Sequence, residues 1–141
     1  MPDYVWPLRH LKKLSITCPL FIIDAELAEF NAIRLVFPSA VIILCRWHVF
    51  EAIEAHVHQV GFIPEDEDWK EFKLGFHSVI NEKSCDSLVA SWGTFRDKWA
   101  KKCPDAVQYL LDTWLCAGRK EALCKAFFPE TTHFEFFTTS P

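Results

Sequence analysis

Residues 20–44 read LFIIDAELAEFNAIRLVFPSAVIIL, and this stretch decides the fold class. It begins and ends with short apolar runs, 20–23 and 41–44, which are rich in the residues that favour strands. Strands without polar alternation are buried on both faces, which is typical of parallel sheets. Between them, residues 25–36 carry apolar side chains at helical spacing. Strand, helix and strand make one crossover unit, so we predict two parallel strands with a right-handed connection.

Helices are predicted on both sides of this unit. Apolar residues recur at helical spacing over residues 3–14 upstream and 47–59 downstream. From about residue 65 to 129 the pattern is helical throughout, and residues 133–139 are aromatic and Thr-rich, which favours an extended segment. We therefore predict an α/β portion over 1–62, an all-α portion over 63–130 and a returning segment over 131–141.

Three residues mark predicted helix ends in the all-α portion. Ser84 is placed to cap a helix. Pro104 suits the first turn of the next helix, and Gly118 suits its C-terminal end. A short last helix over 119–128 follows.

Composition limits the classes of function. The chain has 141 residues, half of them hydrophobic, which is enough for a buried core. Its formal net charge of −4 argues against a free-standing electrostatic nucleic-acid binder. No apolar run approaches the roughly 20 residues of a membrane span, and no signal-peptide pattern opens the chain. The six cysteines contain no Cys-x-x-Cys pair, so we predict reduced thiols. We also predict a soluble intracellular protein without a membrane partner.

Asp24 comes directly after the first predicted strand. The carboxyl ends of parallel strands form the functional crevice of α/β proteins, so Asp24 is a candidate metal ligand or acid–base group. Its place before the predicted helix also suits an N-cap, and position alone slightly favours the cap. One carboxylate is not a two-metal site, because ions roughly 3.5–4 Å apart need several oxygens between them.

Cys45-Arg46-Trp47-His48 follows the second predicted strand. A Cys-x-x-His pair offers two zinc ligands, and His56 and His58 lie downstream. His48 and His56 are about two helical turns apart, which makes a common ion doubtful. A buried Cys beside a helix-capping or core-edge His is therefore favoured over a zinc site.

Two features of the all-α portion could bind a partner. Aromatic stripes could form a groove for a helix or a platform for bases, although their spacing matches ordinary helix cores, which we favour. A small basic face could touch phosphate, and a solvated helix face explains it equally well. The stripes are Trp69, Phe72 and Phe76, then Leu88, Trp92, Phe95 and Trp99, and the basic face is Lys98, Lys101 and Lys102.

Taken together, these residues resemble the central region of Mutator-like (MULE) transposases. The resemblance rests on the order of Trp6-Pro7-Leu8, Phe21-Ile22-Ile23-Asp24, Val36-Phe37-Pro38 and Leu44-Cys45-Arg46-Trp47-His48. Thr113-Trp114-Leu115 and His133-Phe134 agree with it further along the chain. It implies a partial RNase H-like core of α/β class with a helical insertion domain.

The resemblance also implies chemistry. Members of the family cut and transfer DNA with three carboxylates that hold two Mg²⁺ or Mn²⁺ ions. Asp24 matches the second carboxylate and is the implied metal ligand. Cys45 and His48 match a Cys-x-x-His motif beside the active site, which is not a zinc site, and Arg46 and His48 are implied DNA contacts. The resemblance also implies a nuclear protein that binds the DNA of transposon ends.

The other two carboxylates of the family are expected outside the printed sequence, one upstream of Met1 and one beyond Pro141. Asp3, Glu130 and Glu135 are not expected to replace them. We therefore predict a transposase fragment, inactive as an isolated chain and prone to self-association along its unpaired strand. The alternatives are a domesticated DNA- or protein-binding module without catalysis, and a zinc module around Cys45 and His48.

Overall fold

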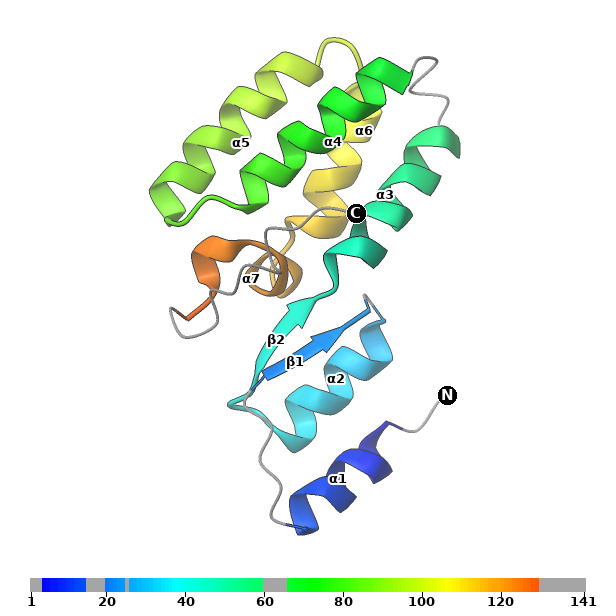
Figure 1. Ribbon diagram of the computed structural model, residues 1–141, viewed down its shortest axis with the longest axis vertical. Helices are drawn as coiled ribbons and strands as arrows, with labels where there is room; N and C mark the ends of the chain where they lie inside the picture. The colour runs from blue at the N-terminus through cyan, green and yellow to red at the C-terminus, as the bar shows by residue number, and fades with distance from the viewer. Residues whose placement is uncertain (1–3, 15–19, 25, 60–65, 130–141) are drawn as a thin grey trace.

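The two predicted strands pair in parallel in the computed structural model, which describes residues 4–14, 20–24, 26–59 and 66–129 (Figure 1). β1 (Leu20–Ile23) lies beside β2 (Val41–Leu44), with Leu20 opposite Val41 and Ile23 opposite Leu44. The crossover helix α2 (Leu27–Val36) connects them. The predicted strand–helix–strand unit is therefore confirmed, and its parallel direction brings the carboxyl ends of both strands to the same edge.

Helices surround this small sheet. α1 (Val5–Lys13) lies against α2, where Lys12 Nζ donates to the carbonyl of Val36, the last residue of α2, at 2.9 Å. Figure 1 shows most of the helices after β2 beyond the carboxyl end of that strand, with α7 (Arg119–Leu123) against the strand. The other helical segments after β2 are α3 (Arg46–Gln59), α4 (Asp66–Ile80), α5 (Cys85–Trp99), α6 (Pro104–Tyr109), the π-helical turn η1 (Leu110–Trp114) and the 3₁₀ turn η2 (Lys125–Phe127). An α/β unit followed by an all-helical portion is confirmed.

Two of the three predicted helix-end signals hold. Ser84 caps α5, since its Oγ accepts from the Ser87 N–H at 3.1 Å, and Pro104 begins α6. The prediction that Gly118 ends the helix begun by Pro104 is wrong. The helix widens into η1, and its C-cap is already Leu115, whose N–H donates to the Leu110 carbonyl at 3.0 Å.

Gly118 instead directly precedes α7. Its φ of +92° is a conformation that glycine adopts without the penalty that a Cβ brings. The predicted last helix over 119–128 is divided into two short segments, α7 and η2.

The aromatic stripes pack into the core, as predicted, with Leu88 and Trp92 only partly buried against it. Phe72 and Phe76 of α4 are fully buried, and Phe95 and Trp99 of α5 are nearly so. The Phe72 ring lies 5.1 Å from Phe95 and 5.4 Å from Trp99, centroid to centroid. A single cluster of buried side chains extends from the sheet through α3 to α4–α7, so the two portions share one core. The predicted boundary at 62 and the segment 133–139 lie outside the described residues, as do Asp3, Glu130 and Glu135.

One side of the sheet is only partly covered. Ile43 and Phe128 form a small buried cluster with Leu20 and Val41 packed against it, whereas Ile22 is 46% exposed. Among the described residues, β1 pairs with β2 alone, so its other edge has no strand beside it there. No helix in the described ranges is long and apolar enough to cross a bilayer.

Candidate functional site

The carboxyl ends of the strands bring Asp24 and His48 into contact. Asp24 follows β1, and His48 stands in the first turn of α3 after β2. The Cys45 N–H donates to the Ile23 carbonyl at 2.6 Å and extends the pairing of the strands by one residue. Asp24 Oδ1 and His48 Nδ1 are then 2.8 Å apart, with the side chains 62% and 45% exposed, respectively. We call these two residues the Asp24–His48 pair.

The cap predicted for Asp24 is wrong. A capping side chain must stand one residue before the helix to reach its first N–H groups. Because α2 begins at Leu27, that position is held by Glu26, which makes no side-chain cap bond. The Asp24 carboxylate faces His48 instead.

The Asp24–His48 pair can orient one imidazole nitrogen. A carboxylate opposite Nδ1 favours the proton on that nitrogen and leaves Nε2 as a proton acceptor or ligand. The Trp47 ring stands perpendicular to the His48 ring with centroids 5.1 Å apart, and half of Trp47 is exposed. The arrangement suits proton transfer or a contribution to a larger ligand set.

The described residues do not by themselves form a divalent-metal site. They contain no group of three or more His, Cys, Asp or Glu side chains placed to hold an ion. Mg²⁺ and Mn²⁺ favour oxygen ligands, and Asp24 is the carboxylate that the resemblance assigns to them. The fit is therefore incomplete, and no reaction step through a metal follows from these residues.

The other candidate zinc ligands have different neighbours. Cys45 is half-buried with a free thiol. The His56 ring stacks on Tyr109 with centroids 3.7 Å apart, and His58 Nε2 lies 3.5 Å from a carboxylate oxygen of Glu54. His56 and His58 are thus held by neighbours on α3 and α6 and are not grouped with Cys45.

Negative charge gathers beside the Asp24–His48 pair. Tyr4 donates its hydroxyl to Glu26 at 2.6 Å, and this bond raises the pKa of Tyr4 to about 12. Burial raises the pKa of Glu29, and the nearby carboxylates of Asp24 and Glu26 raise it further. Sequence analysis did not single out Tyr4, Glu26 or Glu29, although two Glu residues soon after Asp24 could have signalled an acidic edge. Such an edge repels phosphate unless cations neutralise it.

Arg46 does not face the solvent. It is 6% exposed, and its guanidinium donates to the Asn81 side chain and to the carbonyls of Ile80 and Leu123, at 3.3 and 3.4 Å for the carbonyls. This interior position does not fit the expected DNA contact of Arg46. His48 remains on the surface.

The basic face predicted in the all-α portion is largely neutralised. Lys98 forms an ion pair with Glu71, and Lys102 Nζ lies 2.8 Å from Asp68. Both acids belong to α4, so the lysines link α5 and its C-terminal turn to α4. This arrangement favours the solvated-face interpretation over phosphate binding.

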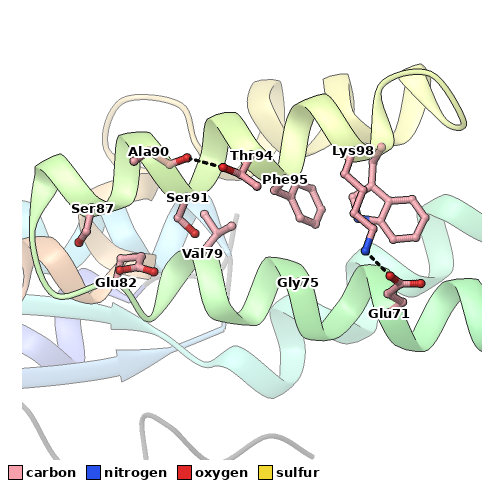
Figure 2. A pocket seen from close by; sticks show the side chains of 11 residues that line it. Glu71, Gly75, Val79, Glu82, Ser87, Ala90, Ser91, Thr94, Phe95 and Lys98 are labelled. Carbon is pink, nitrogen blue, oxygen red and sulfur yellow. Dashed lines mark hydrogen bonds and ion pairs between the residues drawn. The ribbon is translucent and has the colours of Figure 1, made fainter.

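Two hollows open on the described surface. One, of about 290 Å³, lies between the start of α2 and the turn at 116–119, and Leu44 at the end of β2 also lines it. The other, of about 500 Å³, is an open groove between α4 and α5 (Figure 2). Figure 2 shows the pair of Lys98 and Glu71 at one end of this groove and Glu82 toward the other. The groove lies within the helical portion and is not lined by the Asp24–His48 pair.

No protein-family model and no curated protein matches this chain.

Proposed function

We propose that this chain is part of the catalytic domain of a Mutator-like cut-and-paste transposase. In that domain Asp24 contributes one of three metal-binding carboxylates. The single observation that supports this most is the contact between Asp24, after β1, and His48, after the parallel β2. A carboxylate and an imidazole at one edge of a parallel sheet are the arrangement that the sequence resemblance implies.

The proposal has consequences for the partner and the cofactor. DNA at transposon ends is the substrate, the nucleus is the compartment, and Mg²⁺ or Mn²⁺ is the cofactor of the complete domain. The acidic neighbours Glu26 and Glu29 suit a site that divalent ions neutralise before DNA approaches. The RNase H-like core belongs to the proposal, with β1, α2 and β2 as its visible part.

The isolated chain is expected to be catalytically silent, because a lone carboxylate supplies too few oxygens for two ions. Purified chain with nicked or hairpin DNA in Mn²⁺ should show no cleavage above an Asp24→Ala control. Cleavage that disappears in the Asp24→Ala chain would contradict the expected silence.

A graft tests the family assignment with a positive signal. Residues 20–48 replace the corresponding segment of an active Mutator-like transposase, and cleavage of labelled transposon ends is measured. We expect activity in the graft, and a loss of about 100-fold or more when Asp24→Asn is introduced. Ser39→Ala is the control, because Ser39 is exposed in the turn before β2, at the opposite end of the strands from Asp24. A folded graft without activity, or one that is equally sensitive to both changes, would refute the assignment of Asp24.

The alternative function is a domesticated binding module without catalysis. The open groove between α4 and α5 favours it, because that surface is independent of the Asp24–His48 pair. A folded but inactive graft, together with an isolated chain that binds DNA or protein after Asp24→Ala, would support this alternative.

A further inference from the structure

Arg46 is buried in the interior and takes no direct part in the contact between Asp24 and His48. Its Nη2 donates to the carbonyls of Ile80 and Leu123. These are the last residues of α4 and α7, and carbonyls in the last turn of a helix lack partners within the helix. One side chain therefore serves the C-termini of two helices at once, where a positive charge also suits the helix dipoles.

The second hydrogen-bonding arm of Arg46 reaches Asn81. Nη1 donates to Asn81 Oδ1, and the Asn81 Nδ2 lies 2.9 Å from His77 Nδ1. Because a guanidinium only donates, Asn81 must present its oxygen to Arg46 and its NH₂ to His77. His77 Nδ1 is then an acceptor, so the imidazole is neutral with its proton on Nε2. Its ring also stacks on Phe50 of α3, with centroids 5.2 Å apart.

The named hydrogen-bond partners of the charged Arg46 side chain are all neutral. Burial lowers the pKa of Arg46 to about 10, which still leaves the guanidinium charged at neutral pH. Cys124 lies nearby, and burial raises the pKa of its thiol to about 12, so that it too is neutral. The hydrogen bonds to Asn81, Ile80 and Leu123 therefore fix the orientation of the guanidinium. These partners contribute no opposite charge.

The backbone joins Arg46 to the Asp24–His48 pair. Arg46 is the first residue of α3 and His48 the third, about 200° apart around the helix axis at 3.6 residues per turn. An inward Arg46 thus leaves His48 on the outer side. The Val49 N–H donates to the Cys45 carbonyl at 3.1 Å, and the Cys45 N–H donates to Ile23, the residue before Asp24.

We propose that Arg46 is the positioning residue of the Asp24–His48 pair: its guanidinium holds the first turn of α3 against the ends of α4 and α7, so that the His48 ring meets Asp24. The proposal concerns the geometry of the pair. It stands or falls separately from the reaction that the pair serves.

The test measures the contact between Asp24 and His48 in variants of the network. When Asp24→Asn is the only substitution, it should shift the ring resonances of His48 in ¹H–¹³C spectra, because the two side chains are 2.8 Å apart. We expect this shift to fall at least about twofold in an Arg46→Lys background, since an ammonium lacks the planar fork. Asn81→Ala should reduce it in the same direction, although Asn81 is 35 residues from Arg46 in the sequence.

Controls separate positioning from general loosening. Val107→Ala removes methyl groups from a buried side chain of α6 and should leave the Asp24→Asn shift at full size. The His58 ring serves as an internal reference. The milder Asn81→Ala keeps the test decisive if Arg46→Lys fails to fold. A full-sized shift in the folded network variants, or an equal reduction in Val107→Ala, would overturn the proposal.

Discussion

Acidification should weaken this protein through His77, which is buried in α4 beside Arg46. Burial, together with the smaller effects of the charges of Arg46 and Lys73, lowers the pKa of His77 from 6.5 to about 4. Protonation would place a second positive charge next to the Arg46 guanidinium. It would also turn Nδ1 into a donor facing the donating amide of Asn81, so the hydrogen bond between them would be lost.

The size and sign follow from the two pKa values. The unfolded chain takes up a proton on His77 below about pH 6.5, while the folded chain resists it until about pH 4. The stability that this difference contributes is therefore complete above pH 6.5, falls as the pH drops toward 4, and loses nothing more below that. A shift of this size corresponds to about 3 kcal/mol between pH 7 and pH 4. That is a large fraction of the roughly 5–15 kcal/mol that stabilises a typical domain.

Urea unfolding at pH 7, 5.5 and 4 measures this effect. His77→Phe keeps a flat ring against Phe50 and cannot titrate. Between pH 7 and pH 4, the free energy of unfolding of this variant should therefore fall by about 3 kcal/mol less than that of the unmodified chain. His58→Gln is the matched control, because His58 lies on the surface of α3. Equal pH dependence in the unmodified chain and in His77→Phe would refute the assignment of the acid sensitivity to His77.

Three further outcomes are expected. Ile22→Lys should reduce self-association in sedimentation velocity at equal protein concentration, because it places a charge beside the edge of β1 that has no strand next to it among the described residues; an unchanged distribution would locate the contact elsewhere. Phe76→Ala should lower the free energy of unfolding by about 3–5 kcal/mol, since its ring is fully buried, while exposed Leu74→Ala should change it by less than about 0.5 kcal/mol. Elemental analysis should find less than one zinc per chain, whereas one zinc that is lost in both Cys45→Ser and His48→Ala would favour the zinc module.

Local patterns predicted most of the secondary structure. The apolar runs at 20–23 and 41–44 became β1 and β2, because strands buried on both faces carry few polar residues. Ser84 marked a helix start because its hydroxyl bonds within its own turn. Such signals act over a few residues, so they can be read without knowledge of the rest of the chain.

The helix end near Gly118 and the contact made by Asp24 were misjudged. The π-helical turn after Tyr109 moved the helix end away from Gly118, and it lies where Arg119 reaches back to the Thr113 carbonyl at 3.0 Å. No spacing of apolar residues encodes that widening. Asp24 faces another side chain instead of capping because α2 begins only at Leu27 and because α3 brings His48 within 2.8 Å of Asp24.

The sequence by itself determined the order of elements, the parallel pair of strands and the candidates Asp24, Cys45 and His48. The tertiary structure alone decided which residues they contact. It joined Asp24 to His48 and turned Arg46 inward to Asn81. The physical reason is range: a strand or a cap is fixed by the periodicity and hydrogen bonds of adjacent residues, whereas the direction of a charged side chain is fixed by whichever carbonyls and carboxylates the folded chain brings within about 3 Å of it.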